Sequence, residues 1–133
     1  MAIADGAGLP LAVTVASANP AKTALVDATL SARFLRRKIT RLIGEKGYDS
    51  DKLDARLAKR GIEFIAPDRS TRRHNKQDGR QHRRYGRRWK VERLFAWLHN
   101  FRRLVTRDER HVENFPGFVQ LACIVILSRL FVR

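Results

Sequence analysis

The residues from Arg83 to His99 place one carboxylate, that of Glu92, inside the most basic part of the chain. On a helix with 100° per residue, Glu92 lies in a solvent-facing arc about 80° wide. That arc holds Arg88, Glu92, Ala96, His99 and Arg103. The opposite, apolar stripe holds Val91, Leu94, Leu98, Phe101 and Val105. One acid among cations is typical of a metal or phosphate site in an enzyme of nucleic acids, and it also fits an ordinary salt-bridged surface helix.

A second candidate acid, Glu45, lies where a predicted strand ends and a glycine-containing turn begins. Ligands gather at strand ends in open α/β sheets, which makes Glu45 a candidate ligand. The alternative is a surface acid that pairs with Lys46. Asp5 has the position of the acid in an Asp-Gly turn. The remaining acids of this region are assigned to the N-terminus of a helix, where the dipole favours them: Asp49, Asp51 and Asp54.

The positive charge of the chain is concentrated in one segment. The whole chain of 133 residues has a net charge of +15, and residues 69–110 contribute 15 basic and 4 acidic residues, or +11. Residues 1–68 contribute only +3 and residues 111–133 only +1. Most of these cations are arginines, whose planar fork suits phosphate. The distribution predicts a phosphate-backbone footprint and therefore a nucleic-acid partner.

Several other chemistries are excluded by the sequence. The four histidines show no metal-ligand spacing, and neither a glycine-rich phosphate loop nor a Ser or Cys nucleophile motif is present. The single cysteine, Cys123, excludes an intrachain disulfide and is predicted to be a small buried hydrophobe. Trp89 and Trp97 have rings that can stack on bases, although apolar neighbours favour a core position for Trp97. What remains is metal-assisted phosphoryl transfer, in which carboxylates hold two divalent ions and arginines hold the strand.

Apolar spacing and turn residues predict the order of elements along the chain. They are a hairpin (1–16), a helix (20–38), a strand (41–44), a helix (51–60), a strand (62–66), a basic loop (68–85), a helix (86–105) and an apolar helix (118–127). This order indicates one domain over 1–133, with a mixed sheet, flanking helices and C-terminal helices within 86–132. The apolar helix is too short to span a bilayer and is expected to be buried on all sides. No signal peptide is visible. We therefore expect a cytoplasmic protein without a membrane partner.

Three segments resemble bacterial insertion-sequence transposases of the DDE type, in their C-terminal part. Asp5–Ala12 is similar to the hairpin of that family, and Leu42–Ser50 to the segment with its second catalytic acid. Tyr85-x2-Arg88-x3-Glu92-x6-His99 is similar to the signature Tyr-x2-Arg-x3-Glu-x6-Lys around the third acid. The resemblance covers essentially all of the chain. It implies an RNase H-like α/β fold, here truncated at the N-terminus, and metal-dependent cleavage and strand transfer of DNA at the ends of a mobile element.

The resemblance also implies roles for individual residues. Glu45 and Glu92 become the catalytic acids and ligands of Mg²⁺ or Mn²⁺. Tyr85, Arg88 and His99 become contacts to DNA phosphates. The other expected DNA contacts are the basic residues that surround the signature: Arg72, Arg73, Arg83, Arg84, Arg87 and Lys90.

The chain departs from the family pattern at three positions. His99 replaces the signature Lys, and Glu45 replaces an Asp, which adds one methylene to a site where Mg²⁺ demands near-ideal geometry. The first acid of the family lies on a strand upstream of the hairpin, and Asp5 is a poor substitute for it. These departures predict a truncated, catalytically defective transposase that associates with DNA in the nucleoid.

Two further readings of the sequence stay open. One is a non-catalytic DNA-binding regulator or inhibitor of intact transposase, which implies association with full-length transposase or with a second copy of the chain. The other is a chain without a stable fold. The loss of a central strand would also leave a sheet edge exposed for pairing with another chain.

Overall fold

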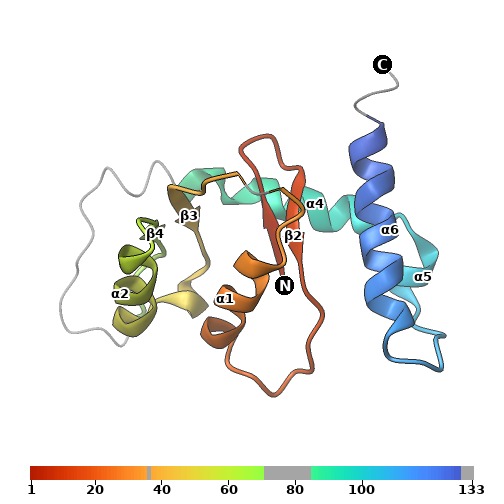
Figure 1. Cartoon of the computed structure of the whole chain (residues 1–133), viewed down its shortest axis with the longest axis horizontal. Helices are drawn as coiled ribbons and strands as arrows, with labels where there is room; N and C mark the ends of the chain where they lie inside the picture. The colour runs from red at the N-terminus through yellow and green to blue at the C-terminus, as the bar shows by residue number, and fades with distance from the viewer. Residues whose placement is uncertain (36, 71–84, 130–133) are drawn as a thin grey trace.

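The computed structural model describes residues 1–35, 37–70 and 85–129, and the expected DNA contacts at Arg72, Arg73, Arg83 and Arg84 lie outside these residues. The described elements, in chain order, are β1 (Ala2–Ala4), β2 (Pro10–Val13), α1 (Lys22–Ser31), β3 (Arg41–Ile43), η1 (Lys46–Tyr48), α2 (Asp51–Lys59), β4 (Glu63–Ile65), η2 (Gly86–Arg88), α4 (Trp89–His99), α5 (Arg102–Val105) and α6 (Asn114–Ser128). Figure 1 shows their arrangement, and the mixed α/β class is the one that the sequence predicts.

The predicted N-terminal hairpin is present and its turn is built by Asp5. Strands β1 and β2 pair antiparallel, with Ile3 opposite Ala12. The Asp5 Oδ1 atom accepts hydrogen bonds from the backbone N–H of Ala7, at 2.8 Å, and of Leu9, at 2.9 Å. Gly8 has a φ of +85°, which a residue with a Cβ rarely adopts. Asp5 therefore serves as a turn residue, as its type and position predict.

The strands form two small sheets in place of the single mixed sheet predicted from the sequence. Strands β1 and β2 form one sheet, and β3 and β4 form a second, parallel sheet in which Leu42 is opposite Phe64. The crossover between β3 and β4 is α2, as expected for parallel neighbours. Within the described residues no strand lies between β1 and β3, so the two sheets stay separate.

Helix α1 is shorter than the helix predicted over 20–38. It ends at Ser31 because the following chain leaves the helix and pairs with β2: Arg33 forms a bridge with Ala12, and the Phe34 N–H donates to the Leu11 carbonyl at 2.9 Å. The apolar residues that suggested a longer helix, Phe34 and Leu35, are exposed. Pairing with β2 has thus replaced the last two turns of the helix predicted over 20–38.

The helix predicted over 86–105 is divided into three pieces. It begins as the 3₁₀ turn η2, continues as α4, and breaks at Phe101, whose backbone is extended with φ −91° and ψ 107°. The break places Arg103 in the separate helix α5, so the predicted polar arc does not extend to this residue. It also leaves Val105 63% exposed, so the apolar stripe ends before this residue.

Helix α6 is buried on one side only, which corrects the expectation of a helix buried all round. Its buried residues follow the i, i+3, i+4, i+7 spacing of a single stripe: Val119, Ala122, Cys123 and Ile126. On the other side, Leu121 and Ile124 are more than half exposed. None of the helices within 1–35, 37–70 and 85–129 has the length and apolar character needed to cross a membrane.

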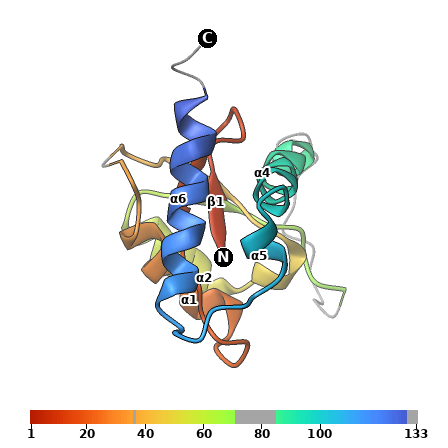
Figure 2. The same ribbon diagram turned by 90° about the vertical axis from the view of Figure 1, so that its right-hand side faces the viewer.

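The β1–β2 hairpin is the middle of three layers, with α1 on one side and α4 with α6 on the other (Figures 1 and 2). Alternate hairpin residues face opposite layers, as the period of a strand requires. Ile3 and Ala12 belong to the core cluster that also contains Val26 and Leu30 of α1. The second cluster is built by Leu94, Leu98, Ala122, Cys123 and Ile126, with Ala2, Ala4, Leu9 and Val13 of the hairpin packed against it.

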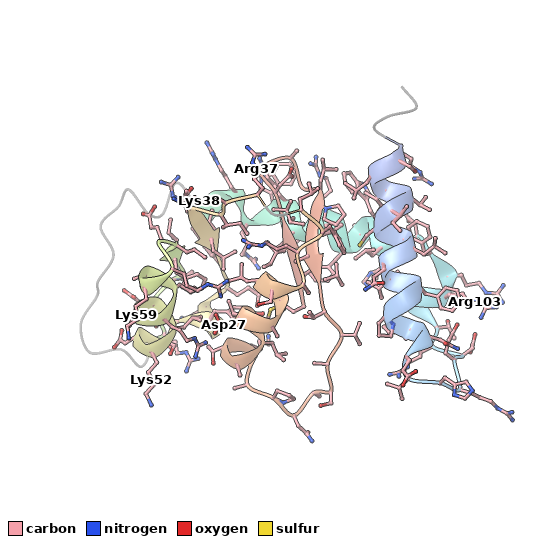
Figure 3. The ribbon with its side chains drawn as sticks, viewed as in Figure 1. Asp27, Arg37, Lys38, Lys52, Lys59 and Arg103 are labelled. Atoms are coloured by element: carbon pink, nitrogen blue, oxygen red, sulfur yellow. The ribbon has the colours of Figure 1, made fainter. Side chains whose placement is uncertain are left out.

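The first cluster extends to α2, and a charged contact supports it. Leu53 and Leu57 of α2 are almost fully buried. Asp27 of α1, labelled in Figure 3, pairs with Arg56 at 2.6 Å and with Arg60 at 2.8 Å. These pairs are partly exposed and join α1 to α2 at the rim of the cluster, where each contributes about 0–1 kcal/mol.

The burial of Cys123 leads to a testable chemical property. The thiol is 1% exposed, and burial raises its pKa to about 11. At pH 8 the thiolate, which is the reactive form, is present at about one part in a thousand. We expect a disulfide reagent such as Ellman's reagent to label the native chain at pH 8 at least a hundredfold more slowly than the chain unfolded in urea. Equal rates in the two states would contradict this placement of Cys123.

Candidate functional site

Glu45 and Glu92, the two acids singled out in the sequence, both contact the guanidinium of Arg88. The Arg88 Nη1 atom lies 3.2 Å from Glu45 Oε1, and its Nη2 atom lies 2.6 Å from Glu92 Oε1. We call this group of three residues the Arg88 bridge. The fold thus brings two acids from distant parts of the chain to one place, as their candidate roles require.

Each member of the Arg88 bridge is positioned by the end of an element. Glu45 follows β3 and precedes η1, so the end of the parallel sheet sets its place. Arg88 is the last residue of η2, and Glu92 lies in the first turn of α4, one helical turn away. The side chains of Glu45 and Glu92 are 50% and 56% exposed, and that of Arg88 is 29% exposed. Solvent therefore reaches both carboxylates. The two ion pairs fix the relative positions of the three side chains but add little to the free energy of unfolding.

The sequence left a structural alternative open for each of Glu45 and Glu92, and the structure bears out only one of the two. Glu45 pairs with Arg88 and, at 4.0 Å, with Lys22, and not with its neighbour Lys46 as the alternative expected. The alternative for Glu92, a salt bridge on a surface helix, is itself observed as the Arg88–Glu92 pair. The Arg88 bridge therefore combines a structural ion pair with the convergence that a functional site needs.

A cleft of about 780 Å³ adjoins the Arg88 bridge, between the hairpin, residues 33–35 and 37–45, η2 and α4. Its lining is strongly cationic: Lys22, Arg33, Arg37, Lys38, Arg41, Arg87, Arg88 and Lys90. Figure 3 shows Arg37 and Lys38 on the segment that joins α1 to β3. Asp5 and Glu45 are its acidic lining residues. Tyr48 also lines the cleft; burial, and then the charge on Glu45, raises the pKa of its hydroxyl, which therefore stays protonated at neutral pH.

The tip of the hairpin is held by α4 in a way that the sequence analysis missed. Lys90 Nζ donates to the Gly6 carbonyl, and Arg93 Nη2 donates to the Ala7 carbonyl. The Arg93 guanidinium lies between two indole rings, 4.9 Å from the centroid of Trp89 and 5.0 Å from that of Trp97. The signal in the sequence was the Trp-x3-Arg-x3-Trp spacing, which places all three side chains on one helix face. Trp97 also packs against the second core cluster, as predicted.

The remaining expected DNA contacts are distributed along η2 and α4. Tyr85 precedes η2, and the Arg88 guanidinium lies 5.7 Å from the centroid of its ring. Arg87 is exposed on η2, and His99 is exposed at the last position of α4. His99 lies two helical turns from Glu92, about 10 Å along the axis. Lys90 lines the cleft but contacts the hairpin tip, which gives it a structural role beside the expected one.

The arrangement of the Arg88 bridge does not fit a divalent metal ion. Carboxylate oxygens are the donors that Mg²⁺ and Mn²⁺ prefer. However, the guanidinium of Arg88 lies between the two carboxylates and already supplies their counter-charge. Within the described ranges no group of three or more His, Cys, Asp or Glu side chains is placed to hold a metal. We therefore derive no chemical step through a metal ion for this arrangement.

Arg103 takes part in a contact far from the expected polar arc. Its guanidinium pairs with Glu109 at 2.9 Å and lies over the ring of Phe118, 5.3 Å from the centroid. The Glu109 side chain is only 3% exposed. Figure 3 shows Arg103 beside α5 and α6, at the right-hand end of the molecule and away from Arg37 and Lys38. Arg103 therefore stabilises the connection of α5 to α6 and does not join the Arg88 bridge.

Comparison with known proteins finds similarity to insertion-sequence transposases. The chain is 35% identical over 132 residues to a putative transposase for insertion sequence element IS402 from Burkholderia cepacia, covering 93% of this chain and 59% of that relative. It is 27% identical over 128 residues to a putative transposase for insertion sequence element IS6501 from Brucella ovis, covering 96% of this chain and 95% of that relative. No solved structure matches the chain. The sequence profile of the family described as transposase DDE domain matches residues 1–131, and the chain belongs to this family.

Proposed function

We propose that this chain binds DNA as part of an insertion-sequence transposase, with the phosphate backbone lying along the cationic cleft beside the Arg88 bridge. One observation carries the proposal: Glu45 and Glu92 meet at Arg88, next to a cleft lined by eight Lys and Arg side chains. Arginine binds phosphate through its fork, and a concave cationic surface raises the local concentration of a polyanion. The family membership supports DNA as the partner.

The arrangement of the Arg88 bridge supports binding without cleavage by the chain on its own. Phosphoryl transfer by two metal ions needs several carboxylates that converge on the ions. In the Arg88 bridge two carboxylates converge on an arginine. We infer that cleavage and strand transfer need a further carboxylate and a displaced Arg88, and that the isolated chain is catalytically defective. An RNase H-like sheet belongs to the same proposal, supported by the parallel β3–β4 pair next to an antiparallel hairpin.

The alternative function is a regulator that occupies the DNA of an intact transposase without cutting it. The pairing of both acids with Arg88 supports this function equally, since a regulator needs the basic surface and no metal. The two functions differ in the response to Glu92→Gln. A transposase predicts divalent-metal-dependent nicking of the ends of its element that this substitution abolishes, and a regulator predicts DNA binding that survives it.

The direct test is the salt dependence of DNA affinity. The dissociation constant of the 133-residue chain for a fluorescent 30-base-pair duplex is measured by anisotropy without divalent ions. Between about 50 and 200 mM salt we expect the affinity to fall by about 10²–10⁴, because each neutralised phosphate releases counterions. Glu92→Gln should give the same curve or bind slightly more tightly. An affinity that does not change with salt would contradict the proposal.

A further inference from the structure

Helix α6 has an apolar face that no described element covers. Its buried stripe packs against α4 and the hairpin, whereas Leu121 and Ile124, on the opposite side, are 54% and 60% exposed. Figure 2 shows α6 at the surface of the molecule, in front of the hairpin. Scattered apolar residues are ordinary on a protein surface, whereas a contiguous apolar face indicates a site of interaction.

The exposed residues of α6 form a stripe whose order is the same from both ends. With 100° per residue, Gly117, Leu121, Ile124 and Ser128 lie within about 60° of one another, and all four are exposed. The two large residues lie between the two small ones, and both pairs have the same midpoint on the helix. A second copy of α6 in antiparallel orientation therefore places its Ile124 level with Leu121 and its Ser128 level with Gly117. The stripe is thus complementary to itself.

The absence of charge on α6 narrows the class of partner. None of the residues from Asn114 to Ser128 is charged, in a chain of which 31% of the residues are charged. A nucleic acid or a charged peptide therefore finds no ion-pair partner on this helix. The described residues of α6 also take no part in the lining of the cationic cleft. Two copies can meet at this face without placing like charges in direct contact, although each carries a net charge of +15.

The Brucella relative offers little polypeptide that could cover this face from within the same chain. The alignment with this chain covers 95% of its length, so few of its residues lie outside the shared region. In that relative, a cover for the corresponding helix has to come from another molecule. A twofold-symmetric pair of identical chains is the commonest assembly of this kind, and it requires a surface that is complementary to itself.

We propose that the stripe Gly117–Leu121–Ile124–Ser128 of α6 is a dimer interface, at which two copies of this chain pair antiparallel about a twofold axis. The small residues at both ends of the stripe allow the two helices to approach closely. A helix of 15 residues is about 22 Å long, so one helix pair buries less than the roughly 1,200 Å² of a stable interface. The dimer is therefore weak, with a dissociation constant on the order of 10–100 µM. The pairing does not depend on the proposed DNA binding.

Sedimentation velocity of the 133-residue chain without DNA tests the dimer directly. Between about 5 and 500 µM protein we expect the average mass to rise from that of one chain toward that of two. Raising the salt concentration from about 50 to 200 mM should tighten the dimer severalfold, because it screens the repulsion between two positive chains. This dependence is opposite to that of DNA binding, which salt weakens. A chain that stays monomeric over the whole range overturns the proposal.

A matched pair of charge variants locates the interface on α6. Leu121→Glu places a charge in the stripe, and we expect it to weaken the dimer at least tenfold because the carboxylate would be buried without a partner. Ala55→Glu makes the same change of net charge at an exposed position of α2 and should alter the dissociation constant less than threefold. Both variants should keep the circular dichroism spectrum of the parent. A dimer that survives Leu121→Glu would overturn the assignment to this face.

Variants with an added thiol test the antiparallel orientation. Gly117→Cys and Ser128→Cys alter the two ends of the stripe, and a Cβ at position 117 meets no atom within 4 Å. In the antiparallel pair the two new thiols are level when the copies carry different variants. They are about 16 Å apart along the axis when both copies carry the same one. A mixture of the variants should form disulfide-linked dimers at least tenfold faster than either variant alone, and the buried Cys123 should not contribute.

The disulfide experiment and the DNA experiment separate this proposal from the proposed function. Linkage of either variant alone at the rate of the mixture would overturn the antiparallel pairing. Salt-dependent DNA binding by a chain that stays monomeric would overturn the dimer and leave the proposed function standing. A dimer that is lost in Leu121→Glu, in a chain that does not bind DNA, would support this interface and contradict the proposed function.

Discussion

Replacing Leu94 by alanine is expected to lower the free energy of unfolding by about 3 kcal/mol, within the range of about 2–5 kcal/mol for buried leucines. Leu94 is fully buried, and its cluster contains residues of α4 and α6 with the hairpin packed against them. The truncation leaves a cavity where three elements meet, which the backbone cannot close. Since small domains are stable by about 5–15 kcal/mol, this change removes a large part of the total.

The matched control for Leu94→Ala is Leu121→Ala. It makes the same change on α6 at a residue that is 54% exposed, and we expect it to cost less than about 0.5 kcal/mol. Urea unfolding followed by tryptophan fluorescence and by far-ultraviolet circular dichroism measures both variants. Equal losses of stability in the two variants would show that the layer of α4 and α6 does not pack on the hairpin as described.

Replacing Arg88 by glutamine is expected to raise the affinity of the chain for Mn²⁺. The substitution removes the positive charge that lies 2.6 Å from Glu92 and 3.2 Å from Glu45, and leaves two carboxylates without that counter-charge. Both acids are about half exposed, so solvent screens the effect, and about a tenfold increase in affinity is a reasonable magnitude. Titration of the free-ion signal of Mn²⁺ by electron paramagnetic resonance measures it.

Arg87→Gln provides the control for the Arg88 variant. Arg87 is on the same 3₁₀ turn, is exposed, and has no ion pair with Glu45 or Glu92 in the described part of the chain. Both variants remove one cation and should lower the salt dependence of DNA binding by about one unit of slope. Only the Arg88 variant should gain affinity for Mn²⁺, and adding Glu92→Gln should reverse that gain. A similar gain in both variants would show that the effect is one of net charge and not of the Arg88 bridge.

Local signals predicted local structure well in this chain. The Asp-Gly turn at Asp5, the strand–helix–strand order around α2 and the burial of Leu94 and Cys123 each follow from a few neighbouring residues. The convergence of Glu45 with Glu92 was expected only through the family resemblance. Spacing along the chain could not show it, because the two acids lie on different elements and meet through Arg88.

The errors arose where distant contacts override local preference. The helix over 20–38 stops early because Arg33 and Phe34 pair with β2, an interaction that no local window contains. The helix over 86–105 breaks because the chain turns at Phe101 to place α5 against α6. The single sheet was predicted from the order of strands, and order does not say whether neighbouring strands touch. The spacing of Trp89, Arg93 and Trp97 could have predicted their stack on α4. Nothing in the sequence indicated that Arg93 also binds the tip of the hairpin.

The contacts between the hairpin and α4 also set the order in which parts of the protein can fold during its synthesis. Gly6 and Ala7 are held by residues 84 and 86 positions later in the chain, and one hairpin face is covered by helices that end at Ser128. At about 5–20 residues per second, the synthesis of α6 is complete roughly 6 to 23 seconds after that of β2. During that interval the nascent hairpin has one uncovered apolar face. Chaperone binding to the hairpin residues would therefore have its greatest effect on yield in this interval.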